Sequence, residues 1–157
     1  MRTARIAIVA LGLLGAWPTA ARADLTAFWG AATSPATRPA RGFGIGVGLL
    51  VLGFEFEYAT IREEDAKSAP GVTTGSFNLL VTTPSRNQLY ATIGGGGYRE
   101  VLQGNAHNGL TSNLGIGAKI GLFGPVRLRL DYRVFALLGH PHTPAVQRFY
   151  AGFNLTF

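Results

Sequence analysis

Few residues in the sequence have side chains that suggest a catalytic or metal site, and they fall in two short segments, residues 100–112 and 140–142. The chain has three histidines and no cysteine, which excludes thiolate nucleophiles and thiolate metal sites. His107 lies near Glu100 and Ser112, and a serine, a histidine and a carboxylate are the parts of a nucleophilic hydrolase. His140 and His142 follow in a later polar segment, so a zinc site built from histidines is the second chemistry to weigh.

Each of these chemistries has a simpler alternative. Five positions separate His107 from Ser112, and on a strand an odd separation places two side chains on opposite faces. Histidines in polar loops are usually only solvated. The glycine run at residues 94–97 has no following lysine with serine or threonine, and the one at 44–48 leads to a strand rather than a helix, so neither fits a phosphate-binding loop. We therefore expect no catalytic site, no cofactor and no metal.

The elements that would hold these residues are β-strands. The last one, residues 146–157, alternates with period two, and its apolar face carries Phe149, Ala151, Phe153, Leu155 and Phe157. Seven more strand segments precede it, at residues 25–33, 43–49, 53–61, 73–83, 88–103, 110–122 and 126–138. In the first segment both faces hold apolar residues, so its facing stays open. The closing strand alone fits either a soluble sandwich or a barrel wall in lipid.

The number and spacing of the strands favour the membrane barrel. Eight is an even number, and the segments approach the roughly 9 to 11 residues that a tilted strand needs to cross a bilayer. Longer connections follow every other strand, at residues 34–41, 62–72, 104–109 and 139–145, and short turns follow the rest. A transmembrane helix over residues 43–54 is too short and too rich in glycine. We therefore predict an all-β fold, an eight-stranded antiparallel up-and-down transmembrane β-barrel.

The amino terminus has the pattern of a secretory signal. Arg2 and Arg5 precede an apolar run over residues 6–17, and Ala21-Arg22-Ala23 offers a small-x-small cleavage site. Cleavage there would divide the chain into a signal peptide, residues 1–23, and a barrel domain, residues 24–157. Three of the 14 basic residues would leave while all eight acids stay, so the net charge would fall from +6 to +3. That charge does not indicate a nucleic-acid partner.

The predicted polar face holds most of the charge of the strands. It carries Glu55, Glu57, Lys119, Arg127, Arg129, Asp131, Arg133 and Arg148, among glycines 44, 46, 48, 94, 96, 115, 117 and 121. A charge in contact with hydrocarbon costs about 2 to 4 kcal/mol near the bilayer midplane, so this face should line the interior. Strands three and seven lie opposite each other in a ring of eight, so the two glutamates should reach Arg127 and Arg129, with Lys119 beside them. The other three charges should form a second cluster. We expect a salt-bridged plug; the alternative is a gate or proton path.

The order of these features resembles a known family. The signal pattern, the eight strands and the ending Tyr150-Ala151-Gly152-Phe153-Asn154-Leu155-Thr156-Phe157 resemble the small outer-membrane β-barrel proteins of Gram-negative bacteria, of the OmpA amino-terminal and OmpX type. The resemblance implies a monomer among outer-membrane lipids, with both termini in the periplasm. It also implies that the outer-membrane assembly machinery reads the last strand, through Phe157 and the apolar residues at every second position before it.

Within such a family three functions remain open. We expect a structural or adhesive role without catalysis, carried by the four longer connections. Some small outer-membrane barrels instead modify lipid A with a serine and a histidine, but the lipid A deacylases of this size carry a His-x-Ser-Asn segment, whereas His107 lies five residues before Ser112-Asn113. A narrow pore is the third function, and it is disfavoured because side chains fill an eight-stranded barrel.

Overall fold

The computed structural model describes residues 21–157. Almost all of the predicted signal peptide, residues 1–23, therefore lies outside the described residues. The described chain forms eight strands: β1 (Arg22–Ala32), β2 (Arg38–Leu49), β3 (Leu52–Ile61), β4 (Gly71–Thr82), β5 (Gln88–Leu102), β6 (Asn105–Phe123), β7 (Val126–Leu137) and β8 (Ala145–Thr156). A short 3-10 helix, η1 (Asp65–Lys67), lies between β3 and β4. In this described part, no helix has the length and apolar character to span a bilayer.

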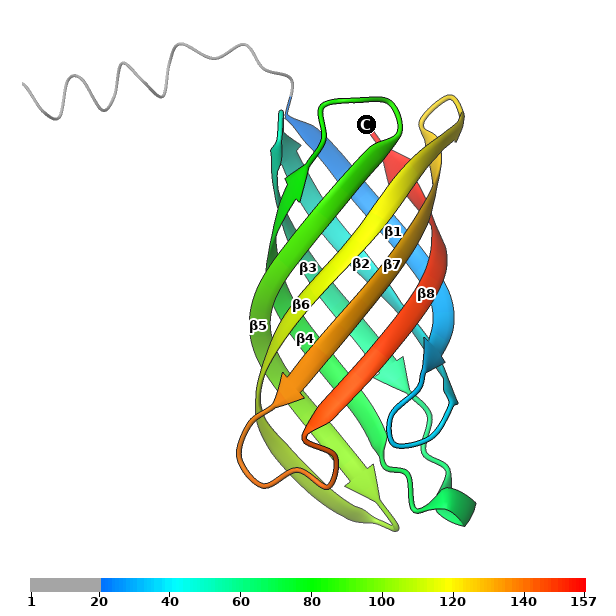
Figure 1. Ribbon diagram of the computed structural model, residues 1–157, viewed down its shortest axis with the longest axis vertical. Helices are drawn as coiled ribbons and strands as arrows, with labels where there is room; N and C mark the ends of the chain where they lie inside the picture. The colour runs from blue at the N-terminus through cyan, green and yellow to red at the C-terminus, as the bar shows by residue number, and fades with distance from the viewer. Residues whose placement is uncertain (1–20) are drawn as a thin grey trace, which may run out of the picture.

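The eight strands form one closed barrel. Each strand pairs antiparallel with the next, and β1 pairs with β8 to close the ring (Figure 1). This confirms the predicted eight-stranded up-and-down fold. The carboxy terminus and the start of β1 lie at one end, drawn at the top of Figure 1, which we call the terminus end. At the opposite end, the loop end, strands are connected by residues 33–37, 62–70, 103–104 and 138–144.

Three connections at the loop end are shorter than the sequence predicted: the loop 62–72 by two residues, because β4 begins at Gly71, and two others by more. In the predicted loop 104–109, Asn105 already pairs with Leu102, so only Gln103 and Gly104 turn, both with positive φ. The predicted loop 34–41 ends early because β2 begins at Arg38. Both predictions were wrong for one reason. Beyond the apolar part of the outer wall both faces of a strand meet polar surroundings, so apolar and polar residues no longer alternate and the ends of the strand cannot be predicted from alternation.

The strands turn large apolar side chains outward and charged ones inward. On the outer wall, Phe77 and Ile116 are 72% and 63% exposed, whereas Glu57 and Arg133 inside are at most 1% exposed. Burying charged side chains away from water is compatible with folding only when each is paired with an opposite charge. The outer wall therefore suits a lipid environment, and the inner wall must form its own polar contacts.

Strand β1, whose facing the sequence left open, turns Thr26 and Phe28 inward. The ring of Phe28 stacks on Tyr150, with the ring centroids 4.0 Å apart. The absence of side chains at Gly42 and Gly152 leaves room for it, since a Cβ on Gly152 would lie 2.7 Å from the Cβ of Phe28. Trp29, the next residue, is 61% exposed on the outer wall.

Candidate functional site

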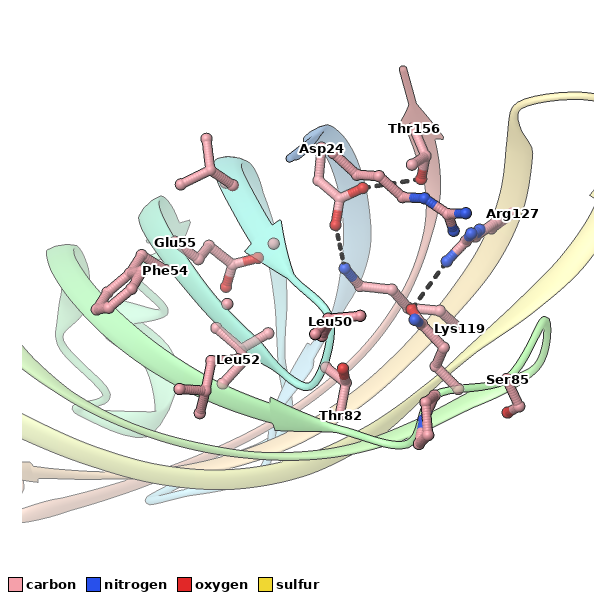
Figure 2. A pocket seen from close by; sticks show the side chains of 18 of the residues that line it. Asp24, Leu50, Leu52, Phe54, Glu55, Thr82, Ser85, Lys119, Arg127 and Thr156 are labelled. Carbon is pink, nitrogen blue, oxygen red and sulfur yellow. Dashed lines mark hydrogen bonds and ion pairs between the residues drawn. The ribbon is translucent and has the colours of Figure 1, made fainter. Parts of the chain in front are cut away.

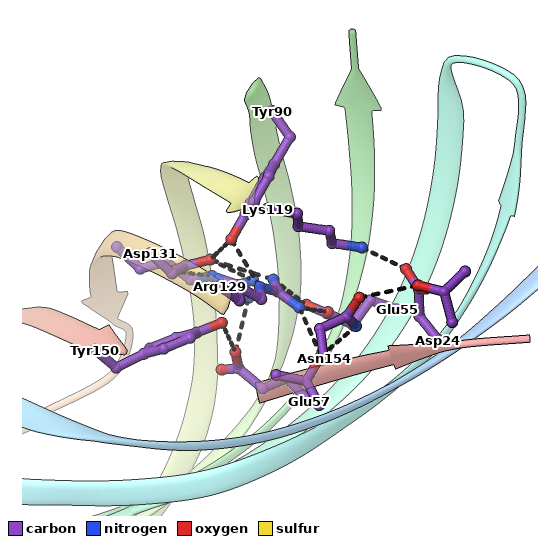
Figure 3. Close-up of polar contacts among 12 residues, drawn as sticks. Asp24, Glu55, Glu57, Tyr90, Lys119, Arg129, Asp131, Tyr150 and Asn154 are labelled. Atoms are coloured by element: carbon purple, nitrogen blue, oxygen red, sulfur yellow. Dashed lines mark hydrogen bonds and ion pairs between the residues drawn. The ribbon is translucent and has the colours of Figure 1, made fainter. Parts of the chain in front are cut away.

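A charged network fills the middle of the barrel (Figure 3). It consists of three acids and three arginines, none more than 5% exposed: Glu55, Glu57, Asp131, Arg129, Arg133 and Arg148. Two neighbouring inward positions on β3 supply the glutamates, and three on β7 supply Arg129, Asp131 and Arg133, because inward positions recur every second residue. The opposite charges are equal in number, so the network is balanced within itself.

Two arginines of β7 hold Glu55 from across the barrel. Arg129 pairs with it through both terminal nitrogens, and its Nη2 donates to Glu55 Oε1 at 3.2 Å. Arg133 Nη2 donates to the same oxygen at 2.8 Å. Fixed, multidentate contacts of this kind are the strongest that arginine and a carboxylate form.

Asp131 and Glu57 extend the network toward β8. Asp131 accepts from Arg133 Nε at 2.9 Å and from the hydroxyl of Tyr90. Glu57 pairs with Arg148, and its Oε2 lies 3.3 Å from Arg133 Nη1. Arg133 thus contacts all three acids and joins the network into one unit.

The structure corrects three predicted pairings. The two expected clusters are one network, because the barrel's strand stagger brings Glu55 level with Arg129 and Arg133 instead of Arg127. Arg127 instead donates to Gln88 Oε1 at 2.8 Å. Lys119 pairs with Asp24, a residue that the sequence placed outside the first strand.

An apolar layer closes the barrel between the charged network and the loop end. Its eight buried residues come from seven strands: Ala32, Ala40, Ile61, Val72, Tyr98, Phe135, Leu137 and Val146. The alternation in the sequence did not predict this layer. Its signal was present in β7, where the inward positions change from charged at Arg133 to apolar at Phe135 and Leu137.

Arg148 joins the two regions. Its guanidinium carbon lies 4.8 Å from the ring centroid of Phe135, in the apolar layer, and 5.1 Å from that of Phe28. The same guanidinium pairs with Glu57 in the network. Burial of a cation costs less free energy when it lies over aromatic faces, because the rings replace part of its hydration.

The residues considered as an alternative hydrolase site at the loop end do not come together in the structure. Glu100 and His107 are cross-strand partners, but Ser112 is on the outer face, so the three side chains do not meet. The buried Glu100 instead accepts from the backbone N–H of His142 at 2.8 Å, and its Oε2 lies 3.1 Å from Nδ1 of that ring. The side chain of His142 is 49% exposed. Within residues 21–157 no three histidine, aspartate or glutamate side chains are grouped closely enough to hold a metal ion, and His140 belongs to no such group.

The terminus end opens into a cavity of about 570 Å³ (Figure 2). Lys119 and Arg127 point into it, together with Asp24 (Figure 2). Glu55, at the edge of the charged network, also lines it. The interior therefore has three successive parts: an open cavity, a charged network and an apolar layer.

Comparisons with known proteins agree with this architecture. Neisserial surface protein A matches with a TM-score of 0.70 at 15% identity, over 87% of this chain and 97% of that one. The eight-stranded closed barrel of this chain is the fold of the small outer-membrane β-barrels. No family model and no curated protein sequence matches the chain.

Other proteins with this fold have different roles. The Yersinia pestis attachment invasion locus protein Ail, solved with the heparin analogue sucrose octasulfate, matches with a TM-score of 0.53 at 12% identity, over 87% of this chain and 99% of that one. The outer membrane enzyme PagL matches with a TM-score of 0.56 at 9% identity, over 84% of this chain and 98% of that one. Similarity at these identities shows the fold, and the fold is shared by an attachment protein and an enzyme.

Proposed function

We propose that the chain is an integral outer-membrane β-barrel that acts without catalysis, with its terminus end in the periplasm and its loop end at the cell surface. The observation that carries this proposal is the two-sided wall: apolar outside, with a self-neutralised charged network and an apolar layer inside. Lipid surroundings stabilise such an exterior. Side chains fill the interior, so the barrel is not built around an aqueous channel.

At the loop end, side chains tie the connections to the barrel, which supports a structural or binding role. Arg38 of β2 donates to the carbonyl oxygen of Ser34 at 2.9 Å and also to that of Pro70. Glu63 accepts the backbone N–H of Gln103 at 2.6 Å. Loops held in one conformation lose little entropy when they bind a partner. The proposed adhesive surface is therefore small and preformed.

The test of membrane insertion is heat-modifiable migration on gels of detergent-extracted outer membranes. A closed barrel stays folded without boiling and migrates differently from the boiled protein. The proposal predicts two positions, and recovery of the protein in the outer-membrane fraction. A single position at both temperatures, with the protein in the soluble fraction, would contradict it.

We also propose that the last strand is the part read by the assembly machinery. Its outward residues Phe149, Phe153 and Phe157 are 53%, 55% and 72% exposed, and Ala151 and Leu155 share that face. Deleting Phe157 should lower the outer-membrane yield more than it lowers the stability of the refolded barrel. Phe123→Ala is a matched control, because Phe123 is a 70% exposed aromatic at the same end on another strand. Equal yields from the two variants would exclude the signal.

A second function, an outer-membrane enzyme, is favoured by one observation. The contact between Glu100 and Nδ1 of His142 orients the imidazole as in a general base, with the ring half exposed. However, no serine or threonine hydroxyl bonds to His142 among the described residues. Mass spectrometry of lipid A from cells that express the wild type or His142→Ala separates the two functions. An altered acyl pattern that requires His142 would support the enzyme, and an unchanged pattern would exclude that activity.

A further inference from the structure

The terminus-end cavity carries more positive charge than its acids balance. Its lining includes Arg22, Arg86 and Arg127, and none of the three forms an ion pair with another described residue. The acids that line the cavity are already engaged, because Asp24 pairs with Lys119 and Glu55 pairs with arginines of the network. The excess charge is therefore local to the mouth of the cavity.

Two of these arginines are directed to the same small area. Arg127 on β7 lies opposite Gly121 on β6. The side chain of Arg86 extends over the same glycine, with its Nε 3.0 Å from the position that a Cβ of Gly121 would take. The turn that carries Arg86 is held there, because Asn87 Oδ1 accepts the N–H of Gly121 at 3.1 Å.

Both side chains keep donors available for a ligand. Arg127 uses one terminal nitrogen on Gln88, and a guanidinium has five N–H donors. Bringing two like charges together is unfavourable unless an anion lies between them. An arginine fork matches the oxygens of a phosphate in geometry, and two guanidiniums match its double negative charge.

We propose that the terminus-end cavity binds a phosphate-bearing molecule through Arg86 and Arg127. The volume of about 570 Å³ is that of a site for a small organic ligand. Two sources share this chemistry: a soluble phosphate ester, and the phosphate headgroup of an anionic lipid at the rim of the barrel.

The site does not depend on Arg22. Cleavage after Ala23 would remove that side chain and leave an α-ammonium group on Asp24, which also lines the cavity. One positive charge would replace another. Arg86 and Arg127 remain in either case, so the mature and the full-length chain should bind alike.

The test is calorimetric titration of the refolded mature barrel, in a detergent without phosphate, with glycerol 1-phosphate. The wild type should bind, and Arg86→Gln and Arg127→Gln should each weaken binding by about tenfold or more, as loss of a charged hydrogen bond does. Arg62→Gln, an exposed arginine at the loop end, is the matched control and should bind as the wild type. Heat-modifiable migration of each variant shows that it is folded.

Repeating the titration in nanodiscs separates the two sources. Binding that persists in phosphatidylglycerol nanodiscs as in phosphatidylcholine nanodiscs supports a soluble ester as the ligand. Binding that phosphatidylglycerol competes away supports the lipid headgroup. No binding by the wild type in detergent, or an equal loss in Arg62→Gln, would overturn the proposal.

Discussion

The charged network and the apolar layer occupy neighbouring parts of one interior but are held together by different forces. On β7 they are two residues apart, at Arg133 and Phe135, and both side chains are at most 1% exposed. In the network most contacts are directional hydrogen bonds between ions, and the acids and arginines balance one another. In the apolar layer the favourable term is burial, which has no preferred direction.

The charged network and the apolar layer make different contributions to the barrel. Burying ions costs free energy that their pairing only roughly repays, so the network adds little net stability but penalises any register that separates its partners. The apolar layer adds stability by excluding water and tolerates changes that keep volume. We infer that the network fixes how the strands align, and that the apolar layer seals the barrel.

The largest effect is expected from Arg133→Met, which tests the network. Arg133 contacts Glu55, Glu57 and Asp131, so its loss leaves three buried acids with only two arginines. The free energy of unfolding should fall by about 3 to 5 kcal/mol. Urea unfolding of the barrel refolded into lipid vesicles measures it. A loss below about 1 kcal/mol would show that the interior is more hydrated than the pairing indicates.

A smaller loss is expected from Leu137→Ala in the apolar layer. Leu137 is 4% exposed, and the substitution leaves a cavity without any unpaired charge, so unfolding should become easier by about 2 to 3 kcal/mol. The same urea measurement applies, with Leu138→Ala as the control, because Leu138 is 51% exposed outside the layer. Equal losses at the two positions would contradict a sealed layer.

The smallest changes in the free energy of unfolding are expected from a tyrosine-to-phenylalanine substitution, made once in each region. Tyr90→Phe removes an acceptor of Arg129 Nε at 2.8 Å and a donor to Asp131, so it should cost about 2 kcal/mol. Tyr98→Phe removes only a 3.1 Å bond to the backbone carbonyl of Leu138 and should cost about 0.5 to 1 kcal/mol. Urea unfolding measures both losses. A larger loss for Tyr98→Phe than for Tyr90→Phe would show that hydrogen bonds stabilise the loop end more than the charged network.

The sequence predicted which residues face inward better than it predicted which ones meet. Alternation identified the inward faces of β3 and β7, because a charge on the lipid side is costly and the pleat has a strict period. It could not identify the partner of Arg127, because strand stagger is a property of the closed barrel as a whole. The inward position of Phe28 was not predicted for a different reason. Both faces of β1 are apolar in sequence, and only the glycines of neighbouring strands make room for its ring.

The same limit applies to the candidate sites. The hydrolase alternative grouped Glu100 and His107 because they are near in sequence, but the side chain of Glu100 contacts His142, forty-two positions away. Arg86 lies in the predicted short turn between the segments 73–83 and 88–103, and nothing in a single strand's pattern shows that this turn folds over the barrel mouth. Contacts between distant segments depend on closure, and local patterns carry no information about it.

That the apolar layer seals the interior whatever the state of the charged network is tested most directly by single-channel recording in planar bilayers. Wild type and Glu55→Ala are compared after refolding. The substitution removes a partner of Arg129 and Arg133 in the network but leaves the apolar layer intact. We expect no discrete conductance steps from either protein. Steps from the wild type would contradict the sealed interior, and steps from Glu55→Ala alone would show that the charged network is a gate.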